Sequence, residues 1–315
     1  MTTRHFVLGP EQRRERVDKV LARLMSEVSR GTVQRWIDEE RVKVDGKPCR
    51  AKDSVSAGSA IDVEPGPALT SDAEPDQSVV LDVPYEDEHL LVVNKPAGLV
   101  VHPARGHEHG TLVNGLLARG YFRRDAGEGL DDADANVRPG IVHRLDKGTS
   151  GVMVVARTAG AREALKAQFQ AHSIERAYEA IVVGRAGSQT FSTLHGRHPR
   201  DRMRFTTRVA DGKRAVTHVR VLTALNGATH LACTLETGRT HQIRVHLAES
   251  GTPVLGDPLY GKPPKDPEMR AVAERIGHQA LHARLLGLVH PVTGAHVRFE
   301  APPPADFAEA LAALR

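Results

Sequence analysis

The feature that most constrains this 315-residue chain is a dense run of charged and hydroxyl residues that leads directly into an apolar strand. The run covers residues 138–151, and the strand follows at residues 152–156. A short buried strand is normally bordered by turn residues rather than by His, Arg, Asp and Lys. Asp146 stands between Arg144 and Lys147, so the chain places an ionised acid beside its core. Such an acid suits a nucleophile or an electrostatic stabiliser, although a structural ion pair or a turn cap would give the same pattern.

Composition bounds the class of protein without fixing its activity. The chain is long enough for two domains, contains no apolar run that could span a bilayer, and begins without the apolar core of a signal peptide. We therefore expect a cytoplasmic protein with no membrane association. Cys49 and Cys233 are too few and too far apart for a disulfide framework or a zinc-binding pattern. The net charge of +4 is compatible with a nucleic-acid partner but does not require one.

Shifts in composition divide the chain into four segments. Residues 1–13 are polar and are expected to form a flexible tail, whereas residues 14–64 carry the apolar spacing of a small folded domain. Residues 65–78 are rich in Pro, Ala, Ser, Asp and Glu without periodicity, which is typical of a linker. Residues 79–315 are expected to form the second and larger domain, beginning with a strand at residues 79–81.

The small domain is expected to combine two short helices, a β-ribbon and a basic surface. One helical face is predicted by the apolar spacing of Val17, Val20, Leu21 and Leu24. A second helix is expected after Ser29, and it carries Arg30 and Arg35. Basic residues gathered in one module are typical of RNA contact, although a solvated helix surface has the same composition.

Three stretches of the larger domain carry further candidate side chains. Lys95 lies beside a proline, where its cation could contact a phosphate or brace the loop that contains Asp146. Tyr178 lies near the start of an expected strand and offers a stacking face and a phenol, although strands favour aromatic residues in any case. Residues 195–208 form the most concentrated basic run and include Arg197 and Arg202, so we expect a hairpin loop that grips RNA backbone.

Two helices of the larger domain have recognisable ends. Thr158 is expected to cap a helix whose outer side carries Arg162. Thr240 is expected to cap a later helix that ends before Gly251. On that later helix Arg244 could face the core or could be an outward arginine on an exposed surface.

Several of these blocks resemble known families. Arg144-Leu145-Asp146, within His-Arg-Leu-Asp-Lys-x-Thr-Ser-Gly, is similar to the signature of the RluA-type RNA pseudouridine synthases. The block from Asn94 to Pro103 resembles the RluD-like branch of that family, and residues 235–247 match a third family block. Residues 14–64 resemble the S4 RNA-binding domain.

The resemblance implies an α+β protein: a small S4-like α/β module followed by a pseudouridine-synthase fold, in which helices flank a central mixed, mainly antiparallel sheet. It implies that Asp146 is the catalytic acid, that Tyr178 packs against the target base and that Arg244 pairs with Asp146. Arg144 would fill the space that a flipped-out nucleotide leaves in the RNA helix. The net isomerisation of uridine to pseudouridine needs no redox step and no added group, so no cofactor and no metal are expected. The expected partner is large-subunit ribosomal RNA, and the enzyme is expected to be a monomer.

Two other functions stay open at this stage. One is a non-catalytic RNA-binding factor of ribosome assembly, which the set of Asp146, Tyr178 and Arg244 disfavours. The other is a metal-dependent hydrolase that would use the histidines between His102 and His109. These histidines lack the ligand spacing of conventional metal sites, which disfavours that function.

Overall fold

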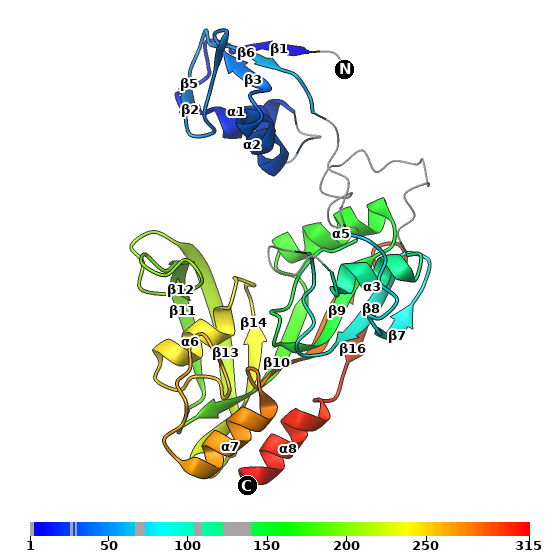
Figure 1. The fold of residues 1–315 in the computed structure, drawn as a ribbon, viewed down its shortest axis with the longest axis vertical. Helices are drawn as coiled ribbons and strands as arrows, with labels where there is room; N and C mark the ends of the chain where they lie inside the picture. The colour runs from blue at the N-terminus through cyan, green and yellow to red at the C-terminus, as the bar shows by residue number, and fades with distance from the viewer. Residues whose placement is uncertain (1–2, 26–27, 29, 67–72, 104–108, 122–139) are drawn as a thin grey trace. The chain divides into compact units, whose positions relative to one another are not determined.

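The computed structural model describes residues 3–25, 28, 30–66, 73–103, 109–121 and 140–315. The described residues separate into two compact units, one ending at Ala73 and the other beginning at Glu74 (Figure 1). This division falls within the segment 65–78 that the composition predicts to be a linker. None of the described helices is both long and apolar enough to cross a membrane.

The first unit packs two helices against a small sheet. The helices are α1 (Val17–Leu24) and α2 (Arg30–Asp38). The sheet has the strand order β1-β6-β3-β4, with the bounds Arg4–Val7, Ala60–Val63, Val42–Val44 and Lys47–Pro48. A two-stranded ribbon of β2 (Glu15–Arg16) and β5 (Ser54–Val55) completes the unit. Val20, Leu21 and Trp36 share one core with the strands, whereas Leu24, expected on the same face of α1, is 42% exposed.

The prediction of a flexible tail over residues 1–13 is wrong in part. Arg4–Val7 forms strand β1, which pairs antiparallel with β6 from Arg4 opposite Val63 to Val7 opposite Ala60. Backbone hydrogen bonds to an open sheet edge need no apolar alternation, so a polar segment can form an edge strand that its sequence does not announce. Phe6 adds the one apolar side chain of this strand that packs on the core.

The second unit is built on a large, mainly antiparallel mixed sheet, as the resemblance implied (Figure 1). Nine strands follow the order β12-β11-β13-β14-β10-β15-β9-β8-β7, and β16 pairs with β15. The one parallel contact within the described sheet joins β15 and β9, with His282 opposite Ser150. The strands have the bounds β7 Asp82–Glu86, β8 Leu90–Lys95, β9 Ser150–Ala156, β10 Glu175–Val183, β11 Gln189–Arg197, β12 Phe205–Thr206, β13 Lys213–Ala224, β14 Ala228–Leu235, β15 Leu281–Val289 and β16 His296–Glu300.

Strand β9 lies between two helices, which explains why its sequence is a continuous apolar run from Val152 to Ala156. Val152 and Val154 face a cluster that contains Leu165 of α5 (Ala159–Gln170). Met153 and Val155 face the opposite cluster, which contains Leu112 of α3 (Leu112–Ala118). A strand covered on both faces reads as a continuous hydrophobic run rather than as an alternation.

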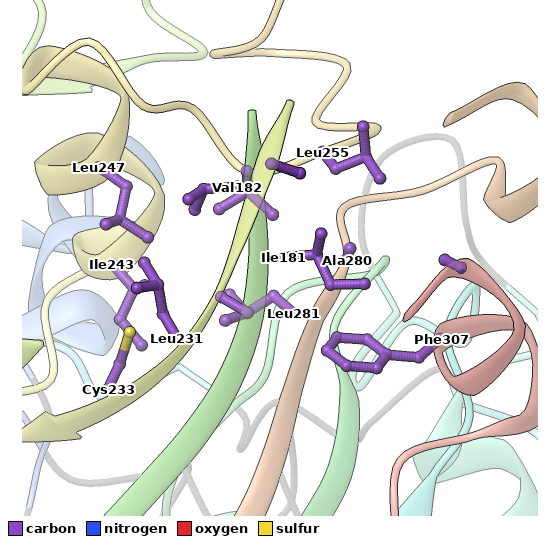
Figure 2. Close-up of a cluster of buried hydrophobic side chains, with 14 of the residues drawn as sticks. Ile181, Val182, Leu231, Cys233, Ile243, Leu247, Leu255, Ala280, Leu281 and Phe307 are labelled. Carbon is purple, nitrogen blue, oxygen red and sulfur yellow. The ribbon is translucent and has the colours of Figure 1, made fainter. Parts of the chain in front are cut away.

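A second core holds the other half of the sheet (Figure 2). In this view Leu231 of β14 meets Ile243 and Leu247 of α6 (Gln242–Glu249). Ile181 of β10 lies on the other face of the sheet, beside Ala280 and Phe307. Phe307 belongs to α8 (Ala305–Ala313), which with α7 (Pro267–Ile276) closes this end of the unit. The core therefore fixes α6, whose first turns carry functional side chains.

Local sequence signals gave some helix ends correctly and others not. Thr158 accepts a hydrogen bond from the backbone N–H of Ala161 and caps α5 as predicted. Thr240, by contrast, does not cap α6, because the residue before this helix is His241 in a left-handed conformation with a φ of 59°.

Two further expectations for the larger domain are wrong. The strand expected at residues 79–81 begins only at Asp82. Arg162, expected on the outer side of α5, is only 5% exposed.

The packing of α8 leads to a stability prediction. Phe307 is 1% exposed, so Phe307→Ala should leave a cavity and lower the free energy of unfolding of the second unit by about 3–5 kcal/mol. Chemical denaturation followed by circular dichroism measures this change. Val292→Ala, at a position that is 59% exposed, should change the same free energy by less than about 0.5 kcal/mol. Equal effects of the two variants would show that Phe307 does not anchor the helix.

Candidate active site

Asp146 lies on a loop of residues 140–149 that folds back along strand β9. The loop is tied to this strand by the bond from Ala156 N–H to Gly140 O and by the bridge between Ile141 and Val155. Leu145 is buried in the core, and it fixes the neighbouring Asp146 at the rim of the sheet. The Asp146 side chain is 20% exposed, so the carboxylate is held by the protein and still reaches solvent.

The structure brings Asp146 and Arg244 together from segments 98 residues apart. Arg244 Nη1 donates to Asp146 Oδ2 at 2.8 Å. The rest of the guanidinium binds Asp257, with Nε to Oδ2 at 2.7 Å and Nη2 to Oδ1 at 2.9 Å. Arg244 therefore faces inward. It forms a bidentate pair with the buried Asp257, and its remaining N–H edge binds Asp146.

Electrostatics keep Arg244 and Asp257 ionised. Burial by itself would lower the pKa of Arg244, but the hydrogen bonds and charges of Asp257 and Asp146 outweigh burial, so its pKa is raised. Burial would raise the pKa of Asp257, but the Arg244 hydrogen bond and charge outweigh burial and lower it. Backbone N–H groups of Leu259 and Tyr260 also donate to Asp257 Oδ1, at 2.9 and 3.0 Å. The buried pair of Arg244 and Asp257 is stable because its carboxylate oxygens are satisfied by hydrogen bonds. Removing either partner would leave an uncompensated buried charge and would be strongly destabilising.

Asp257 is a functional residue that sequence reasoning missed. It lies in the turn Gly-Asp-Pro-Leu-Tyr-Gly of residues 256–261, whose glycines and proline by themselves predict only a rigid connector. The signal that could have found it is a carboxylate followed by Pro258 inside a turn, since Asp commonly accepts hydrogen bonds from the next backbone N–H groups.

Tyr178 comes to the same place from β10. It packs against the cluster that contains Leu145, next to a register shift between Ala177 and Tyr178 in the pairing of β10 with β15. The pKa of the phenol is raised to about 12, mainly by burial and further by the charge of Asp146, while Arg176 opposes the rise. Tyr178 is therefore a neutral phenol at neutral pH, able to donate a hydrogen bond and to offer a ring face.

Lys95 does not match its predicted contact with RNA phosphate. Its side chain is 0% exposed, and Nζ donates to the carbonyl oxygens of Pro96, Leu99 and Lys147 at 2.9, 2.8 and 3.2 Å. An inaccessible ammonium with three acceptors cannot contact a phosphate in this conformation. Since one acceptor is the residue after Asp146, the geometry matches the alternative of a brace for this loop.

Two neighbours of Asp146 on the same loop differ in role. Arg144 is exposed, and its charge acts on His241, so it lies at the opening beside the acid. His143 instead accepts a hydrogen bond from Val154 N–H at 3.0 Å and stacks on Phe169. Burial, together with Arg176, lowers the pKa of His143 to about 3, so it is a neutral structural residue.

The basic run of residues 195–208 forms a hairpin, as expected. We call residues 189–208 the arginine hairpin; β11 pairs with β12 through Gly196 opposite Thr206 and Arg197 opposite Phe205. Arg197 and Arg202 are both exposed, and Arg197 lies over the Phe205 ring at 5.1 Å while donating to Arg202 O. His195 is instead buried and contacts the carbonyl oxygen of Thr240 through Nε2, so it ties the hairpin to the start of α6.

The remaining predicted residues lie elsewhere. Arg35 belongs to the first unit and pairs with Glu39 at 3.2 Å. The side chain of Arg30, the residue Ser29, and His107 with Glu108 lie outside the described residues. Within the described part of the chain, no three His, Cys, Asp or Glu side chains come together as a metal site would require.

Comparisons with known proteins identify the family of this chain. The RNA pseudouridylate synthase family profile matches residues 89–249, a range that contains Asp146, Tyr178 and Arg244. A protein named ribosomal large subunit pseudouridine synthase D from Xanthomonas campestris pv. campestris is 46% identical over 306 residues, which cover 95% of this chain and 89% of that protein. The chain belongs to the RNA pseudouridine synthase family.

Other similarities extend the assignment to the whole chain. The S4 domain profile matches residues 15–61. A protein of the same name from Pseudomonas aeruginosa is 44% identical, covering 96% of this chain and 92% of that protein. The solved structure of human RNA pseudouridylate synthase domain containing 1 has a TM-score of 0.55 and 26% identity, and it covers 73% of this chain and 86% of that one.

The buried Lys95 predicts a pH dependence of stability in this pseudouridine synthase. Burial lowers the pKa of Lys95 to about 7 from its ordinary value of 10.5, while Asp146 opposes this change. Between these two values the unfolded chain binds the additional proton, so this group makes the free energy of unfolding rise with pH. Removing it in Lys95→Met should flatten that rise by about 1–2 kcal/mol between pH 7 and pH 9 in urea denaturation.

A matched control is the exposed Lys262. Lys262→Met should reproduce the pH dependence of the unchanged protein. A Lys95→Met variant with the same pH dependence as the unchanged protein would show that the pKa of Lys95 is not lowered in the folded chain.

Proposed function

We propose that this chain converts specific uridines of large-subunit ribosomal RNA into pseudouridines, with Asp146 as the reacting carboxylate. The reaction breaks the N-glycosidic bond of uridine and rejoins the ribose to a carbon of the same uracil. The observation that carries the proposal is the ion pair of 2.8 Å between Arg244 and the partly exposed Asp146. The rest of the Arg244 guanidinium is bound by the buried Asp257. The names of the bacterial relatives support large-subunit RNA as the substrate.

Each of the three predicted catalytic residues has a role that fits its surroundings. Asp146 is oriented because Arg244 Nη1 donates to Oδ2, and its side chain is 20% exposed, so it can reach a substrate. Tyr178 holds the uracil by its ring face and by a phenol that remains protonated. The guanidinium of Arg244 offsets the negative charge that Asp146 brings next to the core.

RNA binding is assigned to the basic side chains outside this trio. Arg144 at the opening would occupy the space of the flipped nucleotide, whose removal from the stack costs a few kcal/mol. Arg197 and Arg202 of the arginine hairpin would contact phosphates. Arg30 and Arg35 would bind RNA from the S4 domain.

The proposal is tested by Asp146→Asn. The variant keeps the shape of the side chain but removes its charge, so pseudouridine formation under single-turnover conditions should fall by about a thousandfold or more. Its affinity for ribosomal RNA should stay within about twofold, because base-independent phosphate contacts dominate affinity. Retained isomerisation would exclude Asp146 as the reacting group. An unchanged protein that binds this RNA without forming pseudouridine would instead indicate a non-catalytic binding factor.

A separate measurement tests the arginine hairpin. Removing one phosphate contact in Arg202→Ala should reduce the slope of log affinity against log salt by about 1. The control is Arg275→Ala, an exposed position on α7 at the far end of the same unit (Figure 1). Arg275→Ala should leave the slope unchanged. The same slope for both variants and the unchanged protein would show that the hairpin does not contact RNA through Arg202.

A further inference from the structure

His241 faces the oxygen of Asp146 that Arg244 leaves free. Arg244 occupies Oδ2, whereas His241 Nε2 lies 3.7 Å from Oδ1. Their side chains are 18% and 20% exposed, so both line the same opening. A separation of 3.7 Å is longer than a hydrogen bond, and a small rotation of either side chain would form one.

The other ring nitrogen of His241 is engaged by Tyr260. Tyr260 Oη lies 2.9 Å from His241 Nδ1, and it accepts a hydrogen bond from the backbone N–H of Phe205 at 2.8 Å. With the phenol oxygen already accepting from an N–H, its own hydrogen is available to Nδ1. A neutral imidazole that accepts at Nδ1 carries its hydrogen on Nε2, the atom that faces the carboxylate.

The charges around the ring agree with a neutral imidazole. Burial lowers the pKa of His241, and the positive charges of Arg244 and Arg144 lower it further, while Asp146 and Asp257 oppose the change. A neutral ring has one N–H, and a lone pair at Nε2 would repel Oδ1. The facing carboxylate therefore favours the same tautomer as Tyr260 does.

The backbone holds His241 in a conformation that is uncommon for this residue type. Its φ of 59° is left-handed, which costs about 1 kcal/mol or more unless the surroundings enforce it. The next residue, Gln242, enforces it: its side chain accepts from Arg239 N–H and the Thr237 hydroxyl, and it donates to Val216 O and Thr217 Oγ1. The imidazole is therefore fixed in place before RNA arrives.

We propose that His241 is a positioning residue of the isomerisation, which holds Oδ1 of Asp146 through Nε2–H in a relay that runs from Phe205 N–H through Tyr260. This inference rests on the proposed function of Asp146. Phe205 belongs to the arginine hairpin, so the relay connects the RNA-contacting hairpin to the reacting carboxylate. Arg244 then fixes one carboxylate oxygen and His241 orients the other, which sets the direction of Asp146 relative to the ribose and base.

The test compares His241→Asn with His241→Gln. Asn tolerates the left-handed backbone but is too short to reach Oδ1 with its amide, whereas Gln carries an N–H to about the distance of Nε2. The single-turnover rate of pseudouridine formation should fall about tenfold in His241→Asn and return to within about threefold in His241→Gln. RNA affinity should be the same in both variants, since neither change touches the phosphate contacts. The thermal unfolding midpoint should be lower in His241→Gln, because Gln tolerates the left-handed backbone less well than Asn does.

A second variant keeps the inference testable if His241 variants do not fold. Tyr260→Phe removes the hydroxyl that fixes the tautomer and that accepts from Phe205 N–H, and it should slow the same step about threefold to tenfold. Its control is Tyr121→Phe, which removes a hydroxyl bonded to Glu86 on the edge of the sheet and should leave the rate unchanged.

The outcomes separate this inference from the proposed function. If the unchanged enzyme forms pseudouridine while His241→Asn and Tyr260→Phe are both as fast, the relay is wrong and the role of Asp146 stands. Equal losses in His241→Asn and His241→Gln would also overturn the relay, because they would trace the effect to the backbone rather than to Nε2–H. An unchanged enzyme with no isomerisation activity would overturn the proposed function itself.

Discussion

One guanidinium between two carboxylates determines the organisation of this active site. Moving a charged arginine out of water is costly, and a single exposed carboxylate would repay little of that cost. The buried Asp257 satisfies two of the guanidinium N–H groups, and the turn that carries it satisfies Asp257 in return. The one remaining edge then reaches Asp146, so an acid at the rim is held by a charge anchored in the interior.

The fold serves this arrangement by bringing distant segments to one rim of the sheet. The loop of residues 140–149 leads into β9, α6 presents Arg244, and the turn at Asp257 follows that helix. Beneath the loop, Lys95 binds the carbonyl oxygen of Lys147. The β8–β9 pair is covered on both faces, and α6 is fixed by the core of Figure 2, so the loop and the helix both rest on rigid supports. Rigid supports of this kind keep reacting groups oriented before the substrate binds.

The sequence predicted those parts that depend on local pattern. The apolar run of β9 and the cap at Thr158 follow from neighbouring residues, and the family blocks identified Asp146 and Arg244 as partners. The apolar run and the cap act over a few residues, whereas the pairing of Asp146 with Arg244 was implied by the family resemblance and by no local pattern.

The misses depend on the tertiary environment. The polar segment Arg4–Val7 became a strand because β6 offered an open edge, and Lys95 became inaccessible because three carbonyl oxygens converge on it. A long polar side chain near a proline looks the same in sequence whether it reaches solvent or the interior. Asp257 was missed for a related reason: its partner lies on another element, and the turn motif alone does not reveal it.

The central claim is that Asp257 orients Asp146 through Arg244, and the most direct measurement is the single-turnover rate of Asp257→Asn on ribosomal RNA. The substitution removes the buried charge and leaves Asp146 and Arg244 in the chain. Because it also lowers stability, the rate is measured well below the unfolding midpoint of the variant. The account predicts a rate about a hundredfold lower, with RNA affinity unchanged, because the acid loses its fixed orientation. An Asp257→Asn enzyme as fast as the unchanged protein would contradict it.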